Sequence, residues 1–241
     1  MMNGDWIMVN WLVEKINKSL ASEIVVKNHY LHRKPNCIHS FGLYDNELLL
    51  GIIIYGIPAS NSVMQLCGKD EQKNVIELVR LWTVDDGQRN KESYLISHSL
   101  KMLPYEIVIS YADASYGHVG IVYQATNWIY TGLTDRHVAW KIDGEQKQHS
   151  RHFFDNYGGI EKAKEVLGNR MTAFERPQKH RYIFFNTDRR RKKELLKKLK
   201  YSILPYPKAD KVYVSPLIDK IESENIANAK LQYELFSFSN S

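Results

Sequence analysis

The sequence lacks several features that would assign it to a membrane or to an export route. No apolar run approaches the roughly 20 residues that a helix needs to cross a bilayer. The first twenty residues, MMNGDWIMVNWLVEKINKSL, carry acids early and have neither a basic lead nor a small-residue cleavage site, so they are not typical of a signal peptide. We therefore expect a cytoplasmic protein with no membrane partner.

Cysteine is scarce as well, with Cys37 and Cys67 as the two examples in the chain. An oxidised scaffold would need more, so we expect both as reduced thiols, with a single disulfide as the alternative. The sequence also contains no G-x-S-x-G, no P-loop pattern and no G-x-G-x-x-G, which removes the usual signatures of serine hydrolases, P-loop NTPases and dinucleotide-binding enzymes. It shows no internal repeat and no low-complexity tract.

Positive charge is unevenly distributed along the chain. The formal net charge is +6, and residues 189–200, RRRKKELLKKLK, hold eight basic residues and one acid, or +7, so the remaining chain sums to −1. A local cluster of this density suits the phosphate backbone of a nucleic acid, whereas the alternative is a solvated helix face rich in lysine. The clustering favours nucleic acid. The predicted contacts are Arg189, Arg190, Arg191, Lys192 and Lys193.

The length of 241 residues and an ordinary composition, 44% hydrophobic and 25% charged, fit one globular domain with or without an extension. A helix is expected over residues 10–27, because Trp11, Leu12, Ile16 and Leu20 fall on one helical face. Apolar patterns and turn residues predict the later elements. These are a hairpin (39–43 and 48–57), strand 75–84, helix 92–103, strand 106–112, short helix 120–128, a strand from 129, strand 137–144, helix 159–167, strand 181–185, the basic helix and either a last helix or a loose tail after 216.

This order predicts an α/β (α+β) fold with a mixed central sheet flanked by helices. The segment 48–57 is apolar on both faces, which is typical of a central strand. The polar turn over 85–91 links strand 75–84 to the following helix. Such a turn leaves backbone N–H groups free at a helix N-terminus, where they bind phosphate well.

Two charged residues stand where charge is unusual. Arg80 belongs to a strand that otherwise has a buried pattern, and a buried guanidinium needs an anionic partner. That partner is either a ligand, such as the donor or a nucleic-acid phosphate, or a structural carboxylate such as Asp113. Asp113 ends the strand over 106–112, where it is either a catalytic base or the N-cap of the next turn. Three further polar residues share this neighbourhood, Ser110, Ser115 and His118, with His118 as a second candidate base.

His29 and Tyr30 stand in the polar segment NHYLHRKPNCIH, which precedes the hairpin. They line a ligand pocket, bind a metal or lie exposed in a loop. The spacing of His32, Cys37 and His39 nearby lacks the paired pattern of a structural zinc site. An open iron or zinc site that uses His29 with distant ligands is the remaining metal alternative.

Aromatic residues are frequent in the segment SYADASYGHVGIVYQATNWIYTG, residues 110–132. Tyr123 lies on the predicted short helix, and Tyr130 lies just beyond it. Each is a candidate general acid. The chain has 15 tyrosines, however, so core packing is the alternative for both.

The order of elements resembles the GNAT family of N-acyltransferases. In that family the fourth strand and the following turn bind the pantetheine and diphosphate of acyl-CoA, and the helix after the fifth strand lies near the acyl group. The matching segments here are VIELVRLWTVDD, GQRNKES, EIVISYAD and the helix around Tyr123. The turn departs from the family's glycine-rich pattern, since it keeps Gly87 alone. The resemblance implies donor contacts from Leu81, Trp82, Thr83, Arg89, Asn90 and Ser93.

Longer strings resemble the Mom family of phage DNA-modification proteins. They are NHYLHRKP, ELVRLW, SYADASYGHVGIVYQATNWIYTG, RHFFDNYGG and KHRYIFFNTDRRRKK, and they lie within residues 20–205. The resemblance implies a phage- or prophage-encoded enzyme in the bacterial host cell. Such an enzyme converts adenine in double-stranded DNA to N6-carbamoylmethyladenine, which blocks host restriction. We expect a GNAT-like catalytic domain over 1–187 and, packed on it, a basic extension over 188–241.

The catalytic set that follows from the resemblance is Asp113, Tyr130, Tyr123, His29, Tyr30 and Arg80. Adenine N6 lies within a base pair, so the base must be flipped out, and Trp82, Trp128 or Tyr130 could stack on it. Acetyl transfer from acetyl-CoA would put a carbonyl directly on N6, whereas the product carries a CH2 group there. Acetyl-CoA therefore fits as the donor only if a metal drives radical chemistry on the acetyl methyl, and iron is associated with some members of the family. A glycyl donor, either a thioester or glycyl-tRNA, needs acid–base steps alone.

Two other functions fit the same residues. One is a GNAT acetyltransferase that acts on a protein or small-molecule amine and whose basic helix binds an acidic partner. The other is a catalytically inactive DNA-binding protein. The sequence leaves these alternatives and the oligomeric state open.

Overall fold

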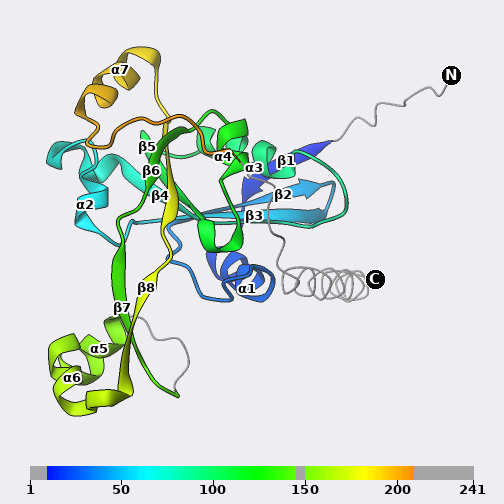
Figure 1. Ribbon diagram of the computed structural model, residues 1–241. Helices are drawn as coiled ribbons and strands as arrows, with labels where there is room; N and C mark the ends of the chain where they lie inside the picture. The colour runs from blue at the N-terminus through cyan, green and yellow to red at the C-terminus, as the bar shows by residue number, and fades with distance from the viewer. Residues whose placement is uncertain (1–9, 145–149, 209–241) are drawn as a thin grey trace, which may run out of the picture.

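The computed structural model describes residues 10–144 and 150–208, and its centre is a mixed seven-stranded sheet (Figure 1). In chain order the strands are β1 (Trp11–Lys15), β2 (His39–Asp45), β3 (Leu48–Gly56), β4 (Val75–Thr83), β5 (Ile107–Asp113), β6 (Ile129–Leu133) and β9 (Lys179–Phe185). Their order in the sheet is β1-β2-β3-β4-β5-β9-β6. β4 and β5 run parallel, and the other neighbouring pairs of this sheet are antiparallel.

Helices flank this sheet, so the predicted mixed α/β class is confirmed. The helices are α1 (Lys18–Asn28), α2 (Asn61–Met64), α3 (Lys91–Lys101), α4 (Ile121–Ala125), α5 (Ser150–Tyr157), α6 (Ile160–Leu167) and α7 (Arg189–Lys198), with short 3-10 turns η1 (Lys69–Asn74), η2 (Ala114–Tyr116) and η3 (Gly168–Arg170). A second sheet pairs β7 (His137–Ile142) with β8 (Met171–Arg176). Across the described ranges, no helix has the length and apolarity that a membrane span requires.

The first predicted helix begins later than expected. The segment Trp11–Lys15 is a strand that pairs antiparallel with β2, from Trp11 opposite Asp45 to Lys15 opposite Phe41. α1 starts after Asn17, whose side-chain oxygen accepts hydrogen bonds from two backbone N–H groups of the first turn. The helical spacing of the apolar residues was therefore misleading, because pairing with β2 at the sheet edge outweighs local preference.

The sheet is buried on both faces, as the apolar run of β3 predicts. Ile53 and Tyr55 pack into one core beneath α3, together with Leu95 and Leu100. The alternate residues of β3, Ile52 and Ile54, pack against Ala21 and Val25 of α1 on the opposite face. The result is a three-layer arrangement in which α1 and α3 cover opposite faces of the strands that carry the site.

β4 and β5 separate after a short stretch of pairing. Their parallel register runs from Val75 opposite Ile107 to Leu78 opposite Ser110. At this last pair, the Ser110 hydroxyl hydrogen bonds the Leu78 carbonyl at 2.9 Å. β4 continues to Thr83 along β3, and β5 continues along β9. The sheet therefore opens between β4 and β5 at their carboxyl ends, which is the usual position of a ligand site in such sheets.

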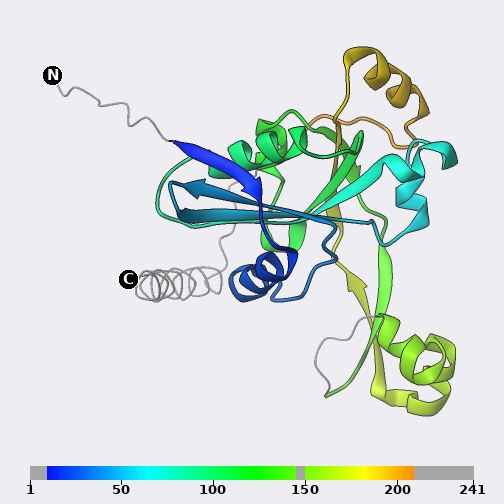
Figure 2. The same cartoon turned by 180° about the vertical axis from the view of Figure 1, so that it is seen from behind.

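An arm is inserted in the chain between β6 and β9, which are themselves hydrogen-bonded neighbours in the sheet. It consists of the β7–β8 ribbon with α5 and α6, and it projects from the body of the protein in both views (Figures 1 and 2). Its own small core contains Ile142, Phe153, Ala163 and Met171. The sequence predicted β7 and α6, whereas α5 and β8 were not anticipated.

α7 is the predicted basic helix, and it packs at the amino ends of β4 and β5. Leu195 is fully buried among residues of α2, β4 and β5. Arg191 Nη2 lies 2.6 Å from Glu71 Oε2 and 2.9 Å from Glu106 Oε2. The expectation that Arg191 is a free DNA contact therefore needs correction, because two carboxylates hold its guanidinium. Arg189, Arg190 and Lys193 are exposed, and their contact with DNA stays a prediction. The predicted helix after residue 216 lies outside the described residues.

The Arg191 ion pairs should contribute measurably to stability, because Glu71 is 4% exposed and would keep just one of its two cations, Lys198 at 2.7 Å. We expect Arg191→Met to lower the free energy of unfolding by about 2 kcal/mol in urea titration. Arg190→Met is the matched control, since the Arg190 side chain is 94% exposed and such ion pairs contribute little. Equal unfolding curves for the two variants would contradict the anchoring role.

Candidate functional site

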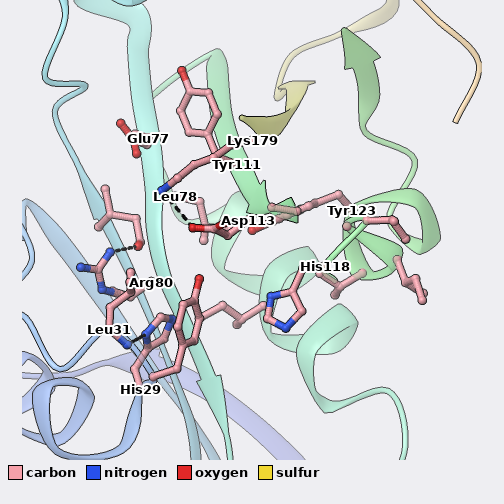
Figure 3. A pocket seen from close by; sticks show the side chains of 18 of the residues that line it. His29, Leu31, Glu77, Leu78, Arg80, Tyr111, Asp113, His118, Tyr123 and Lys179 are labelled. Atoms are coloured by element: carbon pink, nitrogen blue, oxygen red, sulfur yellow. Dashed lines mark hydrogen bonds and ion pairs between the residues drawn. The ribbon is translucent and has the colours of Figure 1, made fainter. Parts of the chain in front are cut away.

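A cavity of about 340 Å³ lies where β4 and β5 separate (Figure 3). This volume is in the range of small-molecule and base-binding pockets. Its walls come from the end of α1, from β4, from β5 and the segment that follows it, and from the first residue of β9. The charged and aromatic lining residues include His29, Tyr30, Glu77, Arg80, Asp113, His118 and Lys179. The structure therefore brings together residues from four distant parts of the chain.

Arg80 enters the cavity from β4 without an anionic partner in the described residues. Its Nε atom is buried and has no hydrogen-bond partner, and Nη1 donates to the carbonyl of the preceding residue, Val79, at 2.6 Å. Burial is the main cause that lowers the pKa of Arg80, and Arg33 adds to it. The alternative of a structural ion pair with Asp113 is not observed. A buried guanidinium with an unsatisfied donor is a ready site for a carboxylate or phosphate.

Asp113 has the N-cap role that the sequence left as one alternative, and it also borders the cavity. Its Oδ1 accepts hydrogen bonds from the Ser115 N–H at 3.0 Å and from the Ser115 hydroxyl at 2.6 Å, so it caps η2. Its Oδ2 lies 3.6 Å from Lys179 Nζ, and the carboxylate also lines the cavity. Asp113 is 8% exposed, and its position facing Arg80 and Glu77 across the opening is visible in Figure 3.

Glu77 is the site residue that sequence reasoning missed. Burial raises the pKa of this carboxyl to about 7, while Lys179 and Arg80 act in the opposite direction. It lines the cavity on the same strand as Arg80. The signal in the sequence was one acid within the strand VIELVRLWT, but its significance depends on burial, which is a property of the fold. A carboxyl with a pKa near 7 is suited to accept a proton at neutral pH.

Four aromatic side chains form a cluster at the cavity. His29 stacks on Tyr30 with ring centroids 4.2 Å apart, and Tyr30 lies 4.5 Å from Tyr116 and 5.7 Å from His118. Burial and then Arg80 lower the pKa of His29 to about 3, so the ring is neutral at physiological pH. Burial and the charge of Asp113 raise the pKa of Tyr30 to about 12. His29 and Tyr30 thus belong to a pocket wall, and the exposed-loop alternative does not hold.

The two candidate general-acid tyrosines have different positions. Tyr123 borders the cavity, and its hydroxyl lies 2.8 Å from the Ser110 hydroxyl in the buried core. Burial raises its pKa to about 12. Tyr130 is not among the residues that line the cavity; its hydroxyl lies 2.9 Å from His180 Nδ1. Tyr130 therefore does not border the cavity that Asp113 and Arg80 line, and its catalytic role stays a prediction.

The predicted donor-binding turn is poorly suited to a diphosphate. Lys91, the first residue of α3, is 2% exposed, and its ammonium contacts Asp86 and the Val84 carbonyl. Glu92 follows in the same helical turn and accepts a hydrogen bond from Thr83 at 2.5 Å. The Lys91 ammonium is therefore already engaged, and the Glu92 carboxylate adds a negative charge at this helix N-terminus, where no side chain caps the N–H groups. Donor contacts by Arg89, Asn90 and Ser93 remain predictions.

The other predicted donor residues lie along β4. Leu81 lines the cavity. Trp82 is not among the lining residues and packs beside Ile52 and Ile54. It lies on the same face of β4 as Arg80, because Arg80 pairs with Ile54 and Trp82 with Ile52. A contact between Trp82 and the donor stays a prediction. Trp128 is fully buried in the core and cannot stack on a substrate.

A metal site around His29 finds no support among the described residues. No three or more His, Cys, Asp and Glu side chains of residues 10–144 and 150–208 come together as a ligand group. His29 Nδ1 instead accepts a hydrogen bond from the Leu31 N–H at 3.2 Å. The described residues do not fit an iron centre.

Comparison with known proteins gives a family for this chain. The family model described as "Mom protein family" matches residues 10–208. The chain belongs to the Mom protein family. A curated relative, "Methylcarbamoylase mom" of Escherichia phage Mu, is 30% identical over 203 residues, which cover 81% of this chain and 83% of the relative. The Mom-like strings in the sequence therefore led to the correct family.

Solved structures similar to this Mom-family protein include acetyltransferases. An N-acetyltransferase from Staphylococcus aureus Mu50 has a TM-score of 0.41 and 12% identity, covering 74% of this chain and 99% of that one. Arabidopsis thaliana NAA60 in complex with acetyl-CoA has a TM-score of 0.43 and 12% identity, covering 73% and 99%. These TM-scores are low, and the likeness is correspondingly weak.

The raised pKa of Glu77 makes stability depend on pH. From the usual value of 4.5 to about 7, the folded protein holds a proton that the unfolded chain has released, so stability falls as pH rises through this window. Glu77→Gln replaces the carboxyl with a neutral isostere and should remove that part of the fall. Urea unfolding at pH 5 and pH 7.5 checks this, with the exposed Glu165→Gln as control. The same pH dependence in wild type and Glu77→Gln would show that Glu77 titrates normally.

Proposed function

We propose that this protein modifies adenine in duplex DNA and leaves a carbamoylmethyl group on N6, which protects phage DNA from host restriction. Membership in the Mom family and the name of the phage Mu relative, a methylcarbamoylase, support this function. The observation that carries it is the cavity itself. It holds an unpaired guanidinium, Arg80, with two carboxyl groups, Glu77 and Asp113, and an aromatic wall.

Adenine reaches the cavity by flipping out of the duplex, because N6 is otherwise held in a base pair. Unstacking a base costs a few kcal/mol, and aromatic contacts in the pocket offset part of it. Tyr30 and its neighbours His29 and Tyr116 provide such a wall. Trp128 is buried in the core, and Trp82 does not line the cavity.

Glu77 is the proposed general base, and Asp113 assists it. The amino group of adenine is a poor nucleophile, so a carboxylate must take a proton as the new bond forms. A carboxyl with a pKa of about 7 is partly ionised at neutral pH and accepts this proton without a large penalty. Arg80 would hold the negative charge of the donor or of the flipped nucleotide's phosphate.

The connectivity of the product favours a glycyl donor over acetyl-CoA. N6 attacks the glycyl carbonyl, forms the C–N bond and expels the donor's oxygen or sulfur, which leaves with a proton. The free glycyl amine then attacks C6 through a five-membered ring, and the bond from C6 to the original N6 breaks. The original N6 becomes the terminal amide, and no oxidant or reductant is needed.

Mass spectrometry of nucleosides from cells that express the protein tests the function. Wild type should yield a modified adenosine, and Glu77→Gln should lower its rate of formation by about 10²- to 10⁴-fold, as expected for loss of a general base. With purified protein, the wild-type rate should rise with pH through about 7. Glu165→Gln should behave as wild type.

Two results would redirect the assignment. Unmodified DNA with tight binding would indicate a DNA-binding protein without catalysis. Unmodified DNA without binding, together with acetylated amines, would indicate an acetyltransferase on another substrate. The exposed arginines of α7 would bind DNA in the first case and an acidic partner in the second.

Heavy-nitrogen labelling of adenine N6 tests the proposed route. The rearrangement moves the label from the exocyclic position to the terminal amide of the product. Fragmentation in the mass spectrometer distinguishes the two positions. A label that stays on the ring-attached nitrogen rules out the rearrangement while leaving the adenine assignment intact.

A further inference from the structure

The arm begins at the rim of the cavity. β6 ends at Leu133 and β7 starts at His137, while β8 ends at Arg176 and β9 starts at Lys179. Lys179 lines the cavity and lies 3.6 Å from Asp113. Whatever molecule covers the mouth of the cavity therefore also meets the base of the arm.

The two faces of the β7–β8 ribbon differ. One face carries Ile142 and Met171, which pack with Phe153 of α5 and Ala163 of α6. The opposite face consists of three cross-strand pairs, and none of its residues belongs to a hydrophobic core cluster of the described chain. We call these residues the bare face: His137 opposite Arg176, Ala139 opposite Phe174, and Lys141 opposite Thr172.

The bare face is accessible and basic. Five of its six residues are exposed, and Phe174, a large apolar side chain, is 38% exposed. Lys141 and Arg176 have no carboxylate partner within the described residues. Asp143, at the far end of the ribbon, accepts a hydrogen bond from the Thr172 hydroxyl at 2.8 Å. Basic side chains interleaved with an aromatic ring are typical of a surface that binds nucleic acid.

The ribbon also has the right position and size. Figures 1 and 2 show α5 and α6 on the side of the ribbon that lies away from α1, the helix whose end supplies His29 to the cavity. The bare face is thus turned toward the side of the cavity. A strand of six residues spans about 20 Å, and the major groove of B-DNA admits a two-stranded ribbon.

We infer that the β7–β8 ribbon docks its bare face in the major groove of duplex DNA, beside the adenine that enters the cavity. Arg176 and Lys141 neutralise phosphates, and Phe174 makes apolar contact in the groove. This inference rests on the proposed action on duplex DNA. It assigns the main duplex contact to the arm, because α7 packs at the other ends of β4 and β5, about 20 Å along β5 from Asp113.

Binding of the full-length protein to a fluorescent duplex, measured by anisotropy across salt concentrations, tests this inference. The double variant Lys141→Ala/Arg176→Ala should bind at least about tenfold more weakly, and its plot of log K against log salt should be shallower by about 2. Arg176→Lys should keep the wild-type slope. Lys162→Ala removes an exposed charge from α6, away from the bare face. This variant should bind the duplex as tightly as the wild-type protein does.

Three outcomes would overturn the inference. One is a double variant that binds and modifies DNA as wild type does, while Arg189→Ala/Arg190→Ala loses binding. Another is a double variant whose oligomeric state changes and whose DNA affinity does not, because the bare face would then contact a second copy. The third is failure of the wild type to bind or modify duplex DNA, which would remove the proposed function itself. Circular dichroism establishes that each variant is folded.

Discussion

The separation of β4 from β5 after Leu78 and Ser110 is the feature on which the rest of the site depends. Up to this pair the two parallel strands satisfy each other's backbone groups, and the Ser110 hydroxyl closes the last step by bonding the Leu78 carbonyl. Beyond it, β3 and β9 hold the two strands apart. Arg80 and Asp113 lie beyond this last pair, and they therefore line an open cavity between the two strands.

The fold leaves the positive charge of Arg80 in this cavity without a paired carboxylate among the described residues. Asp113 is engaged with Ser115 and Lys179, so it does not neutralise Arg80. Burial raises the pKa of Glu77 to about 7, so this carboxyl is partly protonated at neutral pH. The guanidinium consequently has an unsatisfied donor, which is unfavourable in an isolated protein. An anionic ligand would accept a hydrogen bond from this donor, so the cavity favours negatively charged ligands.

Much of this architecture could be predicted from the sequence, because apolar periodicity reports which strands and helices share a core. The family resemblance, rather than periodicity, grouped Arg80, Asp113 and His29 as site residues, and all three line the cavity. Sequence reasoning failed where long-range contacts decide. Trp11–Lys15 becomes a strand because β2 is available to pair. Glu77 becomes a candidate base because α1, β4 and β5 bury it. The Arg191 charge is absorbed by Glu71 and Glu106, which are distant in the sequence.

The central claim is that the cavity between β4 and β5 receives a flipped adenine. A crystal structure of the protein bound to a DNA duplex tests it most directly. The account predicts one adenine outside the helix, against Tyr30, with its N6 within hydrogen-bond reach of Glu77 or Asp113. A duplex bound with every base stacked, and with no nucleotide in the cavity, would contradict it.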